Sequence, residues 1–144
     1  ALLDRDYQKT ATFDYVKTAN GYLQAMMPYY KNFTWKGVMT SSEDGGEGNF
    51  ERVQRMESAK TVKKVEGTED VLVGVFEDKD AREGYMVVNF TDPGRKLDNE
   101  VTLTVESVHN AIVVLNGVKS VRPVKDGKLT LSLKSGEGCF VIPY

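Results

Sequence analysis

Short runs of alternating apolar and polar residues fill the C-terminal half of the chain. Residues 101–105 alternate as Val-Thr-Leu-Thr-Val, and residues 129–133 as Leu-Thr-Leu-Ser-Leu. This period of two is typical of strands that bury one face. Asn-Gly at 116–117 and Asp-Gly at 126–127 separate the runs, and both dipeptides favour tight hairpin turns. The pattern predicts an antiparallel β-sandwich of about seven strands over residues 68–144.

The N-terminal part of the chain follows a different pattern. Apolar residues recur at spacings of three and four over residues 6–27, which predicts an amphipathic helix, and Pro28 is placed to end it. Residues 32–39 are a strand candidate of mixed polarity. Apolar residues then recur every three positions over 50–56, which predicts a short helix. Helix, strand and helix in this order are typical of an α/β segment.

We therefore expect two units that meet near Gly67. Residues 1–67 form the α/β segment and residues 68–144 the sandwich. A sandwich of this size is marginally stable alone and gains from packing on a neighbour. The chain begins at Ala1 and enters the helical pattern almost at once, so we expect it to be a piece of a longer polypeptide.

Composition and charge give no reason to expect nucleic acid or a membrane as partner. The 144 residues carry a formal net charge of −2 with interspersed signs, and 40% of them are hydrophobic. Lys60, Lys63 and Lys64 form the basic cluster of the chain, which we interpret as a solvated surface or an edge strand protected by its lysines, with a phosphate site as the less favoured alternative. No run approaches the ~20 apolar residues that a membrane span requires.

The sequence offers little for catalysis or metal binding. His109 is the only histidine and lies between two predicted strands, where we expect it to be exposed in a turn. Cys139 is the only cysteine and lies in an apolar run, which indicates a buried, inert thiol. One histidine and one cysteine cannot complete a closed zinc site. We expect no catalytic residue, no metal and no cofactor.

An acidic, glycine-rich loop holds Glu43, Asp44 and Glu47. Such residues can bind calcium, but the spacing is not that of an EF-hand, and a solvated loop is the favoured interpretation. Either glutamate could be one of the two carboxylates that glycoside hydrolysis needs. Nothing in the sequence identifies the second, so we expect no hydrolysis by this chain alone.

Aromatic residues after the predicted helix are the candidates for substrate binding. The group Tyr29, Tyr30, Phe33 and Trp35 presents rings of the kind that stack on the C–H faces of sugars, with core packing as the alternative. Within this group we expect Tyr30, Phe33 and Trp35 to contact the substrate. Asn32 and Asn89 each begin an Asn-x-Thr glycosylation pattern. Asn89 falls within a predicted central strand, so we attribute its pattern to chance.

Several segments together carry a family resemblance. They are DVLVGVFEDKDAREGYMVVNFTDPG at residues 70–94 and DGKLTLSLKSGEGCFVIPY at residues 126–144. The second contains a Leu-x-Leu-x-x-Gly-x-Gly pattern, formed by Leu131, Leu133, Gly136 and Gly138. These segments resemble the C-terminal β-domain of bacterial glycoside hydrolases with a (β/α)₈ catalytic barrel, in the β-galactosidase-like group near glycoside hydrolase family 42.

The resemblance extends to the N-terminal part of the chain. VKTANGYLQAMMPYYKNFTWKGVMT, residues 16–40, resembles a late barrel helix that leads into the last barrel strand. FERVQRMESAKTVKKV, residues 50–65, would then close the barrel before the sandwich begins. The catalytic carboxylates of such barrels lie on earlier strands, so the resemblance implies no catalytic residue here. It does place Trp35 where these barrels often hold an aromatic residue against substrate.

The resemblance implies a non-catalytic C-terminal domain that packs on the catalytic barrel of the same polypeptide and stabilises it. A carbohydrate-binding module that contacts sugars through exposed aromatic residues is the alternative. A free-standing enzyme is the least supported, because no acid–base pair is visible. The compartment of the parent enzyme stays open, with an extracellular or periplasmic location as one expectation.

Overall fold

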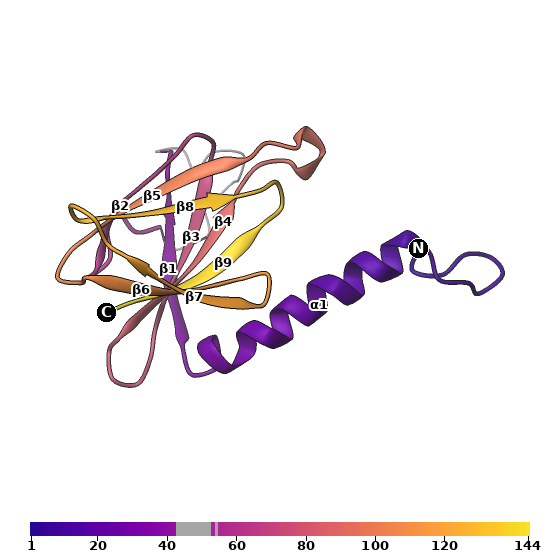
Figure 1. Ribbon diagram of the computed structural model, residues 1–144, viewed down its shortest axis with the longest axis horizontal. Helices are drawn as coiled ribbons and strands as arrows, with labels where there is room; N and C mark the ends of the chain where they lie inside the picture. The colour runs from indigo at the N-terminus through magenta and orange to yellow at the C-terminus, as the bar shows by residue number, and fades with distance from the viewer. Residues whose placement is uncertain (43–52, 54) are drawn as a thin grey trace.

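The fold is mainly β (Figure 1). The computed structural model describes residues 1–42, 53 and 55–144, and within them it contains one α-helix and nine strands in two antiparallel sheets. The elements are α1 Ala11–Tyr30, β1 Thr34–Thr40, β2 Val62–Gly67, β3 Val71–Glu77, β4 Glu83–Asn89, a 3₁₀ turn at Pro93–Arg95, β5 Asn99–Val105, β6 Asn110–Leu115, β7 Val118–Pro123, β8 Lys128–Leu133 and β9 Gly138–Pro143.

The two sheets differ in size. The larger has six strands in the order β1-β3-β4-β9-β6-β7, and the smaller has three in the order β2-β5-β8. Strands β3 to β9 are the seven strands in the region where the sequence predicts about seven, so the mainly β, antiparallel prediction is confirmed there.

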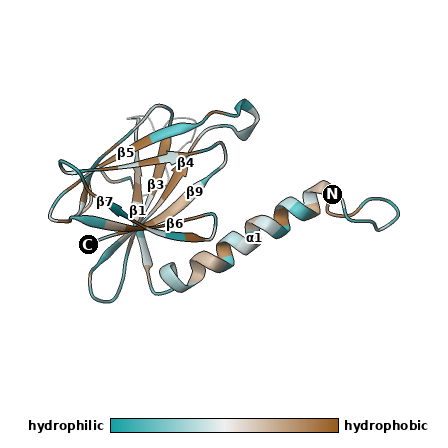
Figure 2. Cartoon of the chain, in the orientation of Figure 1, coloured by the Kyte–Doolittle hydropathy of each residue, from teal (hydrophilic) through white to brown (hydrophobic). Residues whose placement is uncertain are grey.

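The main core lies between the two sheets. Period-two alternation turns one face of strands such as β5 and β8 inward, and Figure 2 shows the hydrophobic residues concentrated in the strands. The most deeply buried side chains from both sheets include Val62, Val71, Val73, Val75, Tyr85, Val87, Val101, Leu103, Leu129 and Leu133. Burial of this apolar surface from both sides gives the sandwich-like arrangement its stability.

Two hairpin turns have the backbone that their residues favour. Asn116 and Gly117 join β6 to β7 with φ of +50° and +77°. Asp126 and Gly127, between β7 and β8, have φ of +51° and +70°. Two successive residues with positive φ make the turn that matches the twist of the flanking strands, which is why Asn-Gly and Asp-Gly predicted these positions.

Helix α1 differs from its prediction at both ends. It begins at Ala11, not near residue 6, because residues before it form a small loop closed by a bridge between Leu3 and Lys9. Pro28 lies inside the helix, which continues to Tyr30. Proline lacks a backbone N–H, so Pro28 removes only one hydrogen-bond donor from the helix. The last turn is retained because Tyr30 packs against the larger sheet.

The C-terminal end of α1 forms a second core on the outer face of the larger sheet. Met26 packs there with Val114 and Phe140, all at most 5% exposed. Phe33 adds an edge-on contact to Phe140, with ring centroids 5.3 Å apart. From this contact α1 runs away from the sandwich, and the N-terminus lies at its far end (Figure 1).

Two strands that precede the expected division near Gly67 are hydrogen-bonded into the sheets. β1 pairs with β3, and β2 pairs with β5. The strand predicted over 32–39 is thus confirmed as β1, at the edge of the larger sheet. The resemblance of residues 1–67 to the end of a barrel stays a prediction.

The short helix predicted over residues 50–56 falls largely outside the described residues. The part that can be described is not helical, since residues 55–60 contain no helix. Arg55 forms a parallel bridge with Val38, and the Met56 N–H donates to the Val38 carbonyl at 2.7 Å. Extended pairing with β1 replaces the helix here, because it satisfies backbone groups along an exposed sheet edge.

Candidate functional site

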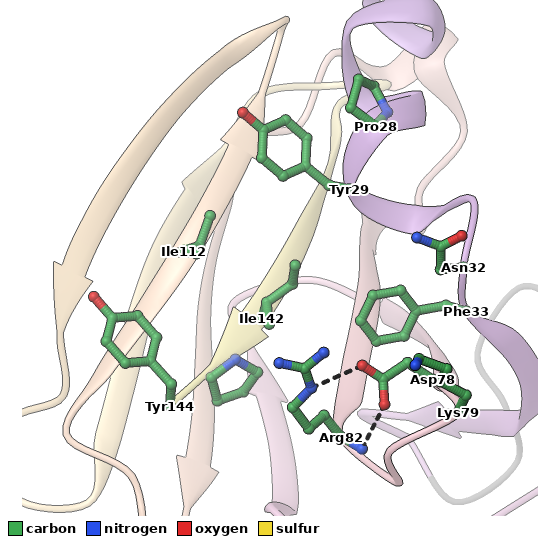
Figure 3. A pocket seen from close by; sticks show the side chains of 11 residues that line it. Pro28, Tyr29, Asn32, Phe33, Asp78, Lys79, Arg82, Ile112, Ile142 and Tyr144 are labelled. Atoms are coloured by element: carbon green, nitrogen blue, oxygen red, sulfur yellow. Dashed lines mark hydrogen bonds and ion pairs between the residues drawn. The ribbon is translucent and has the colours of Figure 1, made fainter.

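A groove of about 780 Å³ lies beside the contact between α1 and the larger sheet (Figure 3). Its walls come from the last turn of α1, the turn between β3 and β4, and the ends of β6 and β9. The lining residues are Pro28, Tyr29, Asn32, Phe33, Asp78, Lys79, Arg82, Ile112, Ile142, Pro143 and Tyr144. Its volume lies in the range of ordinary small-molecule sites, about 300–1,000 Å³.

Apolar side chains form the middle of the groove. Ile112 and Ile142 lie between the rings of Tyr29 and Tyr144, and Phe33 faces them from the α1–β1 connection (Figure 3). The Tyr144 side chain is 56% exposed, so much of its ring is open to solvent. β6 and β9 are interior strands with a neighbour on each side, so the floor offers no free strand edge.

A tight turn between β3 and β4 forms the polar wall. The Asp78 carboxylate accepts from the N–H groups of Asp80 at 2.9 Å and Arg82 at 3.0 Å, and from Arg82 Nε at 2.8 Å. Donation from the Arg82 backbone, with these further contacts, holds the pKa of Asp78 below its usual value. Asp78 therefore organises the turn, and its acceptor sites are used within it.

Other polar groups around the groove have no such partners. Among the described residues, no hydrogen bond or ion pair involves the Asn32 amide, the Tyr29 and Tyr144 hydroxyls or the Lys79 ammonium group. Lys119 lies near the groove, with its Nζ 5.9 Å from the centre of the Tyr29 ring. The groove thus combines aromatic faces with unpaired donors and acceptors and with one lining lysine, Lys79, while Lys119 lies near Tyr29.

The three predicted sugar-binding aromatic residues occupy different environments. Phe33 lines the groove, whereas Tyr30 lies in the second core, with its ring centroid 6.1 Å from that of Phe140. Trp35 is opposite Phe76 in the β1–β3 register and is 46% exposed, but it is not among the lining residues. The structure does not bring the three rings together on one surface.

His109 and Cys139 are of residue types that can serve in nucleophilic catalysis. His109 is exposed, and its backbone N–H pairs with the carbonyl of Tyr144 at 3.0 Å. Cys139 is fully buried in β9, and burial raises the pKa of its thiol to about 12. A neutral, inaccessible thiol is a poor nucleophile. The predicted exposure of His109 and burial of Cys139 are confirmed, and the expectation that neither is catalytic stays a prediction.

The basic cluster is neutralised by neighbouring acids. Lys60 Nζ contacts Glu77 at 2.7 Å and Lys64 contacts Glu66 at 2.7 Å, while Lys63 approaches Glu106 at 3.8 Å. The Glu77 carboxylate raises the pKa of Lys60, and Lys60 in turn lowers the pKa of Glu77. This local pairing agrees with the interpretation of a solvated surface.

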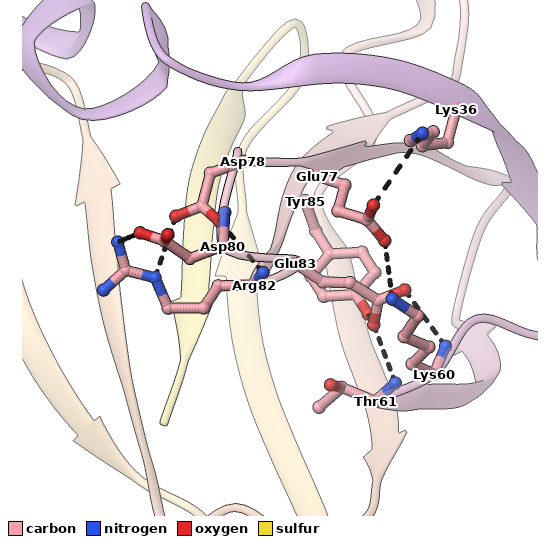
Figure 4. Close-up of polar contacts among 9 residues, drawn as sticks. All are labelled: Lys36, Lys60, Thr61, Glu77, Asp78, Asp80, Arg82, Glu83 and Tyr85. Atoms are coloured by element: carbon pink, nitrogen blue, oxygen red, sulfur yellow. Dashed lines mark hydrogen bonds and ion pairs between the residues drawn. The ribbon is translucent and has the colours of Figure 1, made fainter.

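A buried carboxylate links β4 to the start of β2 (Figure 4). Glu83 is 9% exposed and accepts from the backbone N–H groups of Lys60 at 3.0 Å and Thr61 at 2.8 Å, and from the Tyr85 hydroxyl. Burial and the contact with Glu83 raise the pKa of Tyr85. With three donors already bound, Glu83 acts as a structural link between the two sheets.

The asparagines of the two glycosylation patterns differ in exposure. Asn89 is 3% exposed, and its amide donates to the carbonyls of Leu97 at 2.8 Å and Lys134 at 3.1 Å. It helps Asn99, on β5, to connect the two sheets. Asn32 is exposed beside the groove.

Other predicted features concern metals and membranes. Glu43, Asp44 and Glu47 lie outside the described residues, so the calcium alternative stays a prediction. No group of three or more metal-binding side chains occurs within the described part of the chain. Among these residues, no helix combines the length and the hydropathy that a membrane crossing requires.

Comparison with known proteins identifies no relative. None of the protein-family models, curated proteins or solved structures compared with the chain matches it.

Sequence reasoning missed most of the groove. Ile112, Ile142 and Tyr144 belong to strands whose periodicity predicted burial but not which neighbour would cover them. Arg82 and Lys79 were signalled only as polar residues between two strands. The groove forms where α1 crosses the outer face of the sheet, and no local pattern specifies that crossing.

Proposed function

We propose that this chain is the non-catalytic C-terminal part of a bacterial glycoside hydrolase and that it packs on the catalytic barrel of the same polypeptide. The observation that carries the proposal is the uncovered apolar side of α1. It complements the sequence resemblance, which assigns this segment to the region where such a barrel ends.

Apolar side chains extend along α1 beyond its contact with the sandwich. Figure 2 shows hydrophobic residues on the projecting part of the helix. Tyr15 is 74% exposed, Leu23 51% and Val16 40%. With Ala19 they continue the side of the helix that buries Met26 in the second core, because these positions follow the helical repeat. This apolar stripe is defined as Tyr15, Val16, Ala19 and Leu23.

The helix is also poorly suited to stand in water alone. Its 20 residues include only two charged side chains, Asp14 and Lys17. Gly21 and Pro28 both reduce its intrinsic helical stability, and no side chain caps its N-terminus. Helices of this kind are normally stabilised by burying their apolar face. A folded domain that covers the apolar stripe would supply that burial.

The test uses paired substitutions in the full-length polypeptide that contains this chain. Leu23→Asp places a charge in the apolar stripe, and Gln24→Asp places the same charge on the opposite side of α1 as the matched control. We expect Leu23→Asp to lower the free energy of unfolding of the full-length protein by about 2–4 kcal/mol. Gln24→Asp should leave that free energy nearly unchanged. Equal tolerance of the two substitutions would contradict docking through α1.

Carbohydrate binding is the second candidate function. The groove favours it, because aromatic faces and unpaired polar groups occur together there. The candidate set of Tyr30, Phe33 and Trp35 does not support it as a group, since only Phe33 reaches the groove. A sugar-binding role would place a glycan beside α1, next to the surface that we assign to the barrel.

A further inference from the structure

We infer that the groove beside α1 binds a sugar that carries a carboxylate, that is, a hexuronate unit of an acidic glycan. The inference rests on the carbohydrate-binding candidate and is independent of docking through α1. The shape of the groove, its hydrogen-bonding groups and its charges all favour such a sugar.

The shape and the apolar surface match a pyranose ring. Such a ring has flat C–H faces that pack against aromatic and aliphatic side chains. Tyr29 and Tyr144 flank the floor formed by Ile112 and Ile142, so a ring lying on that floor has an aromatic side chain at each end (Figure 3).

The polar groups match the hydroxyls around such a ring. The Asn32 amide offers a donor and an acceptor, and the hydroxyls of Tyr29 and Tyr144 offer both. None of the three is engaged with another described residue. An extended peptide fits less well, because a peptide binds best along a free strand edge and the floor strands β6 and β9 have none.

The charges select an acidic sugar. Lys79 lines the groove, and Lys119 Nζ lies 5.9 Å from the centre of the ring of Tyr29, another lining residue. Neither lysine is paired with an acid among the described residues. The carboxylate in the wall, Asp78, is already held by Arg82 and two backbone N–H groups. A ligand carboxylate therefore finds two lysines that no described acid pairs with.

The test is a titration of the chain with oligosaccharides of galacturonate, glucuronate and mannuronate, and with neutral galactose and glucose oligosaccharides. Backbone amide shifts in nuclear magnetic resonance spectra report binding and locate it. We expect saturable shifts at residues 28–33, 79–82 and 142–144 with at least one acidic oligosaccharide. Neutral oligosaccharides should bind at least about tenfold more weakly, as expected for the loss of one charge-assisted contact.

Substitutions separate the contribution of the Tyr144 ring to binding from that of the Lys79 charge. Tyr144→Ala should weaken binding of the acidic oligosaccharide about fivefold, since it removes an aromatic contact worth about 1 kcal/mol. The Tyr144 side chain is largely exposed, so its removal should leave the fold intact. Lys79→Gln should weaken binding of the acidic oligosaccharide only, and Lys96→Gln, at an exposed lysine remote from the groove lining, is the matched control.

The outcomes distinguish the inference from the function on which it rests. Binding of neutral oligosaccharides in the groove with no effect of Lys79→Gln would overturn the preference for an acidic sugar but retain carbohydrate binding. Absence of saturable shifts in the groove with every oligosaccharide would overturn both. Loss of affinity in Tyr144→Ala and Lys79→Gln, but not in Lys96→Gln, would support the inference.

Discussion

Asp78 shows at the scale of single residues how one side chain can build a wall of the groove. Its carboxylate receives two backbone N–H groups and the Arg82 guanidinium, and its side chain is only 7% exposed. These donors stabilise the charged form, so the pKa of Asp78 in the folded chain lies below its ordinary value of 3.8.

The pH dependence follows from the sign of that shift. A lowered pKa contributes stability that is complete above the pKa of the unfolded chain and is lost as the pH falls through the folded pKa. We expect Asp78→Asn to be less stable than the parent chain at neutral pH, with the difference shrinking as the pH falls below the ordinary value of 3.8. Urea unfolding of the variant and the parent chain at neutral and at acidic pH measures this difference in stability.

The control is Asp98→Asn, an exposed aspartate for which no hydrogen bond or ion pair occurs among the described residues. It should change stability little at either pH. A difference for Asp78→Asn that stays constant from neutral to acidic pH would show that its charge is not what holds the turn.

Some single residues were predictable from the sequence and others were not. Cys139 lies in an apolar run, and its burial follows from that run alone. Tyr30 and Phe33 share their aromatic character with Trp35, but the first two contact Phe140 while Trp35 is half exposed. The difference comes from the position of α1 on the sheet, which depends on contacts far apart in the chain.

At the scale of elements, two glycines differ in the space that surrounds them. Gly21 lies in α1 with no atom within 4 Å of a built Cβ, so an alanine fits there freely. A Cβ on Gly84, in β4, would lie 2.7 Å from the Phe140 ring and 2.8 Å from the Phe33 ring. These rings are packed in the second core and cannot move away easily.

The substitutions should therefore have opposite effects. Gly21→Ala should raise the helical signal in circular dichroism, since alanine stabilises a helix by about 1 kcal/mol relative to glycine. Gly84→Ala should destabilise the chain by about 1–3 kcal/mol in chemical unfolding, because it overpacks the aromatic cluster. A neutral Gly84→Ala would mean that α1 and Phe33 do not rest on this face of the sheet.

Elements that depend on local pattern were predicted well. The seven strands from β3 to β9 follow from their alternating or continuous apolar runs, and the turns at 116–117 and 126–127 from their glycines. The end of α1 was predicted wrongly at Pro28, because tertiary packing retains one more turn of helix. The pairing of β1 with β3 and of β2 with β5 joins distant segments, and periodicity carries no information about it.

At the scale of the whole molecule, the two sheets depend on strands from both parts of the sequence. β1 contributes Met39 to the main core, and β2 contributes Val62 and Val65, all at most 5% exposed. A chain that starts at residue 31 keeps these strands, whereas a chain that starts at residue 68 loses them.

Truncation therefore tests the division that the sequence predicts near Gly67. We expect the chain from residue 31 to unfold cooperatively on heating, and the chain from residue 68 to lack a cooperative transition, because it loses two strands and part of the core. Cooperative unfolding of the chain from residue 68 would instead support a domain that begins there.

The central claim is that this chain is the accessory end of a larger enzyme. The uncovered stripe on α1 and the sequence resemblance support it from different directions. The most direct test is the mass of the native polypeptide, measured by immunoblot of source cells with an antibody raised against this chain. We predict a band several times heavier than the 16.1 kDa of the chain itself. A native band at 16.1 kDa would contradict the account, and the apolar stripe would need another partner.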